Sequence, residues 1–150
     1  MKVLSCVIFL FLSAFVSAAE WETDFDKALK KSAKEGKPML VNFTGSDWCG
    51  WCIKLDKEVF STKEFTDWAD KNVILVKLDF PRKSNQTAEE KKRNNELVKK
   101  YGVRGYPTIL FIDGKGNVIG KSGYLKGGPS AWTKSAEGIL KKTPDLEFEL

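Results

Sequence analysis

The sequence predicts an α/β fold in which a central mixed β-sheet is flanked by helices. Two observations carry this prediction. Short runs rich in apolar and β-branched residues alternate with segments of helical periodicity, which is the pattern of a βαβ unit. A glycine-containing turn then joins the last two runs, which predicts an antiparallel hairpin followed by a helix, a ββα unit. With 150 residues, the chain is long enough for one such domain with its own core.

The βαβ unit is predicted from four segments. Residues 22–35 carry apolar side chains at helical spacing, and a Gly-Lys-Pro sequence ends this helix. Residues 38–44 form an apolar run typical of a buried strand, and a helix over residues 49–60 opens at a pair of cysteines. Residues 73–79 are so rich in β-branched side chains that we predict a central strand.

Two further helices are predicted from capping boxes, in which Ser or Thr is followed three residues later by Glu. The first box begins at Ser61, and Trp68 is expected to lie in the core beneath its helix. The second begins at Thr87 and its helix ends at residues 101–102. It lies within a polar stretch over residues 81–95, which we expect to be solvated; the alternative is an element that docks a partner protein.

The ββα unit follows from the last third of the chain. Residues 107–112 and 117–121 are predicted to pair around a turn at residues 113–116. A final helix is predicted over residues 130–142, with Trp132 facing the core. The connection in the parallel part of the sheet is expected to be right-handed.

The first 19 residues are predicted to be a secretory signal peptide. Lys2 gives a positive start, an apolar run over residues 3–16 follows, and small residues at positions 17–19 are typical of a cleavage site. The apolar run is short for a membrane span of about 20 residues, although an uncleaved membrane anchor is the alternative. We therefore expect residues 20–150 to form one domain that is periplasmic or secreted.

Cleavage of that peptide would remove Cys6 and leave Cys49 and Cys52 as the two thiols of the mature chain. A disulfide that closes so short a loop removes little entropy from the unfolded chain, so it is a poor structural staple. A thiolate at a strand-to-helix turn meets the positive end of the helix, which lowers its pKa and raises its reactivity near neutral pH. We therefore interpret the pair as redox-active.

The composition argues against several other functions. Haem attachment needs a His directly after the second cysteine, and the chain contains no His. A structural zinc site needs two more nitrogen or sulfur ligands, which the mature chain cannot supply. We therefore expect no metal and no cofactor. The net charge of +5, which falls to +4 without Lys2, is spread along helix faces, so we expect no binding of nucleic acid.

Two motifs resemble those of the thioredoxin superfamily. One is the pentapeptide Trp-Cys-Gly-Trp-Cys at residues 48–52, and the other is Tyr-Gly-Val-Arg-Gly-Tyr-Pro-Thr at residues 101–108. The resemblance covers about residues 24–142. Around the cysteines, the chain is most similar to exported bacterial thioredoxin-like proteins, relatives of the electron-delivering domains of periplasmic reductases. The resemblance implies a thioredoxin fold and a thiol–disulfide oxidoreductase. Copper delivery by the two thiolates is conceivable, but the copper-carrying relatives of this family usually add a histidine, and this chain has none.

The resemblance also implies roles for individual residues. Cys49 would be the attacking thiolate, Cys52 the resolving thiol, and Pro107 the family's cis-proline beside the dithiol. The backbone of Tyr106 would then pair with an extended substrate like an added strand. The residues expected to contact peptide-like substrates are Trp48, Gly50, Trp51 and Tyr106. For Trp48, packing in the core is an equal alternative.

The chain departs from the family pattern in two places. A Gly-Trp pair replaces the Gly-Pro of thioredoxins between the cysteines, so the resemblance does not fix the reduction potential. Asn42 occupies the position of a buried acid that relays the proton of the resolving cysteine, and Asn cannot accept a proton at pH 7. Lys77, which lies near that acid in the family, is retained, so we expect the proton to pass through water or Lys77. Asp47 is expected to face solvent.

The main hypothesis is a thiol–disulfide oxidoreductase that exchanges its dithiol with protein or peptide disulfides. The resemblance favours a reductase, which would need an electron donor such as a membrane-bound reductase. The alternative is a binding module or chaperone of thioredoxin fold, in which the dithiol is incidental. We expect the protein to be a monomer.

Overall fold

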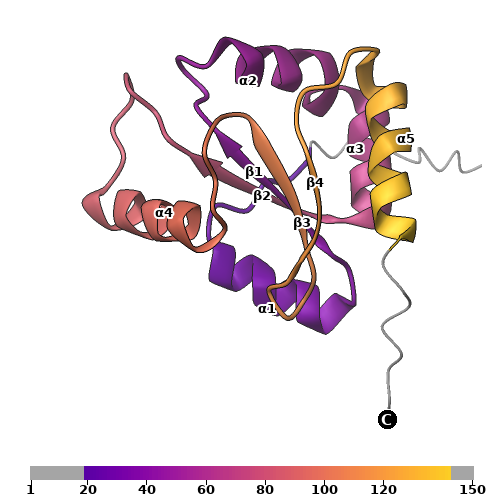
Figure 1. The fold of residues 1–150 in the computed structure, drawn as a ribbon, viewed down its shortest axis with the longest axis horizontal. Coiled ribbons are helices and arrows are strands. Elements are labelled where there is room, and N and C mark those ends of the chain that lie inside the picture. The colour runs from indigo at the N-terminus through magenta and orange to yellow at the C-terminus, as the bar shows by residue number, and fades with distance from the viewer. Residues whose placement is uncertain (1–18, 143–150) are drawn as a thin grey trace, which may run out of the picture.

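The computed structural model describes residues 19–142. The predicted signal peptide (apart from Ala19) and residues 143–150 lie outside the described residues. Four strands form one mixed sheet in the order β2-β1-β3-β4 (Figure 1). The strands are β1 (Met39–Thr44), β2 (Ile74–Asp79), β3 (Thr108–Ile112) and β4 (Val118–Ser122). β1 pairs parallel with β2 and antiparallel with β3, and β3 pairs antiparallel with β4, which confirms the predicted βαβ and ββα units.

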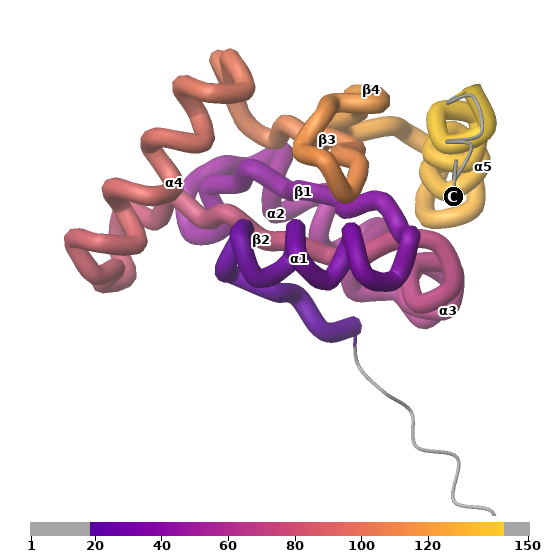
Figure 2. The backbone as a smooth tube through the Cα atoms, turned by 90° about the horizontal axis from the view of Figure 1, so that it is seen from below, coloured from indigo at the N-terminus to yellow at the C-terminus, as the bar shows by residue number. Residues whose placement is uncertain are grey.

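Helices cover both faces of the sheet (Figure 2). α1 and α4 pack on one face, whereas α2, α3 and α5 pack on the other. α2 continues into a π-helical segment, η1, in which the N–H of Ser61 donates to the carbonyl of Asp56 over 2.8 Å. The helical elements of the described residues are α1 (Phe25–Glu35), α2 (Gly50–Leu55), η1 (Asp56–Phe60), α3 (Lys63–Asn72), α4 (Ala88–Lys100) and α5 (Gly128–Lys141).

The alternation of side chains along each strand divides the core into two layers. Leu40 of β1 and Leu75 of β2 face the layer that contains α2, α3 and α5. Their chain neighbours Val41 and Val76 face the layer that contains α1 and α4. All six residues of β1 are buried, as expected for a strand with neighbours on both edges and helices on both faces. Trp132 of α5 is fully buried, as predicted.

The segment before α1 is extended, although residues 22–24 were predicted to be helical. The helix begins at Phe25 and not at residue 22, because the carboxylate of Asp24 accepts the N–H of Lys27 over 3.1 Å and caps it. Upstream, the N–H of Glu22 donates to Leu75 over 2.9 Å, and the N–H of Lys77 donates to Glu22 over 2.8 Å. The residue therefore bridges to the outer side of β2.

The predicted capping boxes had different outcomes. The box at Ser61 is wrong, because Ser61 ends the π-helical segment and Thr62 caps α3 by accepting the N–H of Phe65. The box at Thr87 is confirmed, with Glu90 as its partner. Trp68 of α3, predicted to lie in the core, is half-buried and packs against the core from outside.

Candidate functional site

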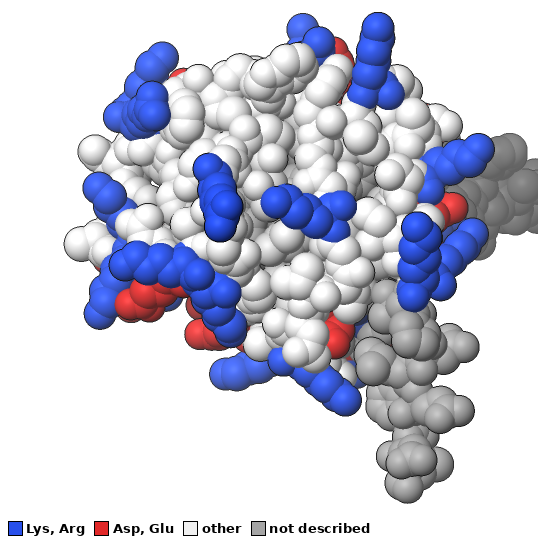
Figure 3. Space-filling model, viewed as in Figure 1, with Lys and Arg blue, Asp and Glu red and all other residues white. Residues whose placement is uncertain are grey.

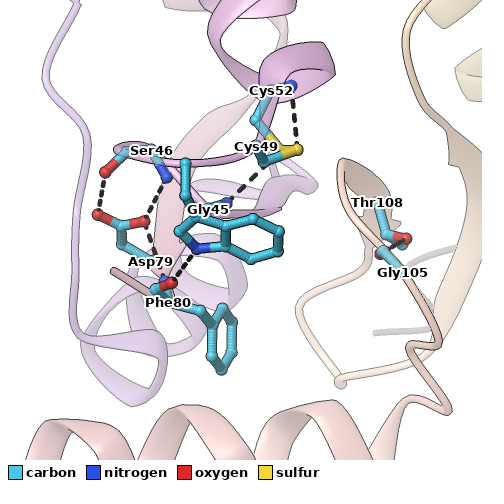
Figure 4. Close-up of a disulfide and its surroundings, with 9 residues drawn as sticks. Gly45, Ser46, Cys49, Cys52, Asp79, Phe80, Gly105 and Thr108 are labelled. Carbon is cyan, nitrogen blue, oxygen red and sulfur yellow. Dashed lines mark hydrogen bonds between the residues drawn. A yellow bond between two sulfur atoms is a disulfide. The ribbon is translucent and has the colours of Figure 1, made fainter. Parts of the chain in front are cut away.

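The two cysteines lie where β1 passes through a short loop into α2, as predicted. They form a disulfide with a Cα–Cα distance of 5.2 Å, and both residues are buried. Cys49 is the N-cap of α2, and the N–H of Cys52 donates to its Sγ over 3.3 Å (Figure 4). The N–H of Gly45 donates to Sγ of Cys52 over 3.5 Å. Once the bond is reduced, these N–H groups stabilise negative charge on sulfur.

The second motif lies beside this disulfide, although it is far away in the sequence. The Tyr106–Pro107 peptide bond is cis, as the resemblance predicts. The ring of Tyr106 meets the ring of Trp48 edge-on, with centroids 6.0 Å apart, and lies 5.1 Å from the ring of Phe80. Burial among these groups raises the pKa of Tyr106. The loop before β3 is therefore packed onto the loop that carries the cysteines.

Trp48 is a half-buried wall of the site. Its indole N–H donates to the carbonyl of Phe80 over 2.8 Å, and the guanidinium of Arg82 lies 3.7 Å from its ring centroid. On the inner side the ring rests against Gly45, where a Cβ would come within 2.5 Å of the indole. Neither expectation for Trp48, core packing or an open contact surface, describes it fully, because one edge is fixed and one face is covered by a cation.

Trp51, which directly precedes Cys52, is the exposed counterpart of Trp48. It is 58% exposed, and its ring centroid lies 5.0 Å from that of Tyr124. The ammonium of Lys54 lies 5.3 Å from the ring of Trp51. The hydroxyl of Tyr124 donates to Glu58 over 2.7 Å, and this hydrogen bond above all raises the pKa of Tyr124.

Asp47 lies at the surface, as expected, and its carboxylate is hydrogen-bonded within the protein. Its carboxylate accepts the backbone N–H groups of Arg82, Lys83 and Ser84 over 3.0, 2.7 and 3.1 Å. These hydrogen bonds, that of Arg82 first, lower the pKa of Asp47. The aspartate therefore fastens the beginning of the polar stretch, residues 82–84, to the dithiol loop.

A second carboxylate, which the sequence argument missed, strengthens this link. Asp79, at the end of β2, accepts the N–H of Ser46 over 3.0 Å and the hydroxyl of Ser46 over 2.5 Å (Figure 4). β1 and β2 are parallel, and Thr44 is paired with Asp79. Since parallel strands end at the same edge of a sheet, the position of Asp79 after a β-branched run was a signal that could have found it.

The two residues expected to relay a proton lie next to each other. Asn42 and Lys77 are paired across β1 and β2, and alternation puts both on the sheet face that α2 covers. Asn42 is 6% exposed, and its side-chain oxygen accepts no hydrogen bond from any described residue. Lys77 is half-buried.

Two features of residues 19–142 bear on other functions. Within this range no helix combines the length and the apolar character needed to cross a membrane. The same residues contain no group of three or more His, Cys, Asp or Glu side chains arranged to hold a metal ion.

Comparison with known proteins places this site in a family. Residues 25–132 match the family model of the thioredoxin-like domain. The chain is 37% identical over 122 residues to the disulfide bond reductase DsbH of Chlamydia pneumoniae, which covers 81% of this chain and 73% of DsbH. It is 30% identical over 92 residues to the thioredoxin-related protein DsbJ of the same organism, but spans only 26% of that protein.

Solved structures agree with this assignment. The DsbH oxidoreductase superposes with a TM-score of 0.80 at 36% identity, over 84% of this chain and 87% of DsbH. A thioredoxin from Thermus thermophilus superposes with a TM-score of 0.61 at 16% identity, over 83% of this chain and 88% of that one, which supports the fold alone. The chain therefore belongs to the thioredoxin-like domain family, and with its Cys49–Cys52 disulfide it is a thiol–disulfide oxidoreductase.

Proposed function

We propose that this protein reduces disulfides of proteins or peptides outside the cytoplasm, after removal of a signal peptide over residues 1–19. The observation that carries the proposal is the Cys49–Cys52 disulfide at the start of α2, packed beside a cis-proline loop. The 37% identity to a protein named a disulfide bond reductase favours electron flow from this protein to its substrate.

In the reaction, the reduced protein is the electron donor. The Cys49 thiolate attacks one sulfur of the substrate disulfide, and the other substrate sulfur leaves as a thiolate that takes up a proton. Cys52 then loses its proton and attacks Sγ of Cys49, which releases the second substrate thiolate. The protein ends with the Cys49–Cys52 disulfide, and the substrate has gained two electrons and two protons.

The substrate is held by the loops on either side of the disulfide. The backbone of Tyr106, before Pro107, pairs with an extended peptide segment. Trp48 and Trp51 contact its side chains from opposite sides. A Cβ at Gly50 would meet no atom within 4 Å, so the space at this end of α2 is open to a substrate chain.

The resolving step requires a group that accepts the proton of Cys52. Asn42 cannot do so at pH 7, and its buried side-chain oxygen accepts no hydrogen bond from a described residue. We propose that the proton passes to water or to Lys77, which is paired with Asn42 across the strands. Replacing Asn42 by Asp should change the exchange rate and its pH profile. An unchanged rate and profile would exclude this relay.

Turnover requires a source of electrons for the oxidised protein. We propose a membrane-bound reductase as that partner, and we propose that the protein acts as a monomer without a cofactor. A purified membrane fraction that reduces the Cys49–Cys52 disulfide of the oxidised protein would support this. A protein that is reduced equally fast without membranes would contradict it.

The reduction potential of the cysteine pair tests the direction of flow. We expect about −250 mV or lower in dithiothreitol and glutathione buffers, near the reducing end of the family range. A value of about −150 mV or higher would instead indicate a disulfide donor or isomerase. A pair that does not equilibrate at all would contradict any exchange reaction.

One observation favours a second function, that of a binding module or chaperone. Trp51 and Ile53 are large apolar residues of α2 that are 58% and 46% exposed. Replacing both cysteines by Ser separates the two functions. Loss of disulfide reduction with retained client binding supports the enzyme, whereas unchanged biological activity of this double variant supports the module.

A further inference from the structure

The loops around the disulfide carry cations that have no carboxylate partner among the described residues. Arg82 lies on Trp48, Lys83 follows it, and Arg104 lies two residues before Tyr106. All three are exposed. The ion pairs within 4.0 Å in residues 19–142 use other lysines, namely Lys27, Lys54 and Lys63. The charges of these three side chains are therefore available to a substrate.

The carboxylates around the same site are engaged within the protein. Asp47 accepts three backbone N–H groups from residues 82–84. Asp79 accepts the N–H and the hydroxyl of Ser46. Glu58 accepts the Tyr124 hydroxyl and lies 3.9 Å from the ammonium of Lys54. A disulfide that approaches Cys49 therefore meets free cations, whereas the nearby carboxylates are hydrogen-bonded to the protein.

One face of the molecule carries mainly positive side chains. In Figure 3, Lys and Arg side chains are spread over the visible face, and Asp and Glu side chains are few. A surface of one sign raises the encounter rate with ligands of the opposite sign and does so less at high salt. The charge around the dithiol site is thus favourable to an acidic ligand at long range as well as in contact.

Arg82 is held in a fixed place in this field. The carboxylate of Asp47 fixes the backbone of residues 82–84, and the guanidinium lies 3.7 Å from the centroid of Trp48. A guanidinium stacked in this way loses less conformational entropy when it binds a ligand, and its planar N–H groups match the two oxygens of a carboxylate. Arg82 is therefore better placed than a mobile surface lysine to recognise a carboxylate.

We propose that Arg82, assisted by Lys83 and Arg104, selects disulfide substrates that carry acidic residues next to the cysteine. Asp47 is the positioning residue that holds the loop of Arg82 beside the dithiol. This inference rests on the proposed reduction of peptide disulfides and specifies their chemical class. It also gives the beginning of the polar stretch, residues 81–84, a role in binding substrate.

The test uses two synthetic peptides, each closed by one disulfide, that differ only in Glu or Gln beside each cysteine. The rate constant for reduction of each peptide by the reduced protein is measured by stopped flow. In low salt we expect the Glu peptide to react several-fold faster, by about the effect of a single charge contact at a partly desolvated site. The ratio of the two rate constants should fall as salt is added.

Variants then assign the selectivity to residues, because intrinsic differences between the peptides cancel when one protein is compared with another. Arg82→Gln should lower the Glu-to-Gln ratio about fivefold, the effect of one charge contact. Lys31→Gln, which also removes one positive charge but at an exposed position of α1, should leave the ratio unchanged. Circular dichroism and urea unfolding show that both variants are folded.

Asp47→Asn distinguishes positioning from net charge. The variant makes the site more positive, so a purely long-range effect would raise the ratio, whereas loss of positioning lowers it. We expect it to fall. An Arg82→Gln ratio equal to that of wild type would overturn the selection of acidic substrates by Arg82. A protein that reduces neither peptide would instead overturn the proposed function.

Discussion

The two tryptophans of the cysteine motif, Trp48 and Trp51, are held in very different ways. Trp48 is fixed by a hydrogen bond to Phe80 and covered by Arg82. Trp51 is 58% exposed, and its ring contacts Tyr124 and the ammonium of Lys54. Each directly precedes one of the two cysteines, Trp48 before Cys49 and Trp51 before Cys52.

The difference shows what the rest of the chain supplies to each side. The side of Trp48 is built from the end of β2 and the loop after it, which place Asp79, Phe80 and Arg82 against the dithiol loop. The side of Trp51 is built from α2 itself and from Tyr124, in the loop between β4 and α5. The first is a rigid wall, and the second is an open apolar surface.

The largest effect is expected from the cysteines that lie between these two sides. Cys49→Ser should lower disulfide reduction by at least about 1,000-fold, because a hydroxyl does not replace the thiolate as nucleophile. Cys52→Ser should still permit the first attack and trap a mixed disulfide, visible by mass spectrometry. A Cys52→Ser variant that turns over like wild type, with no adduct, would contradict the assigned order of attack.

The next effect tests the packing beneath Trp48. Gly45→Ala should destabilise the protein by about 1–3 kcal/mol, because the new Cβ would lie 2.5 Å from Cε2 of Trp48 and the ring must move. The measurement is urea unfolding. Gly50→Ala is the matched control, since a Cβ there meets nothing within 4 Å. Equal stabilities of the two variants would show that Trp48 is not confined.

Conservative replacement of each tryptophan compares the two sides directly. Trp48→Phe removes the hydrogen bond to Phe80 and should cost about 1 kcal/mol of unfolding free energy. Trp51→Phe keeps an exposed aromatic ring and should stay within about 0.5 kcal/mol of wild type. If Trp51→Phe proved the more destabilising, the description of its side as an open surface would be wrong.

The smallest effect concerns the pH dependence of the stability that Asp47 contributes on the Trp48 side of the site. Hydrogen bonds lower the pKa of Asp47 below the ordinary aspartate value of 3.8, so its contribution to stability is complete above that value. The contribution is lost as the pH falls through the lowered pKa. The stability difference between wild type and Asp47→Asn should therefore be constant from neutral pH to about pH 5 and shrink only in stronger acid. Urea midpoints at several pH values measure it.

Much of the scaffold of the site could be predicted from sequence. The apolar run of residues 38–44 and the β-branched run of residues 73–79 identified β1 and β2, and the cysteine spacing identified the start of α2. The cis bond before Pro107 and the neighbouring Asn42 and Lys77 followed from family resemblance. These features depend on local sequence or on motifs with a fixed place in the fold.

The links between loops could not be predicted in the same way. The hydrogen bonds of Asp47 to residues 82–84 depend on the path of a polar loop, and loop composition does not fix that path. The N-cap of α3 was predicted at Ser61 but lies at Thr62, because the π-helical segment adds a residue to the turn before it. The link at Asp47 depends on non-local geometry, whereas the shift of the cap follows from a local irregularity of the helix.

The extended residues before α1 have a consequence for solubility. β2 is an edge strand of the sheet, and Glu22 covers part of that edge by hydrogen bonds with Leu75 and Lys77. An uncovered edge is a template for pairing with the strand of another molecule, which leads to aggregation. A chain that starts at residue 20 keeps this cover, whereas one trimmed to the first helix would expose the edge.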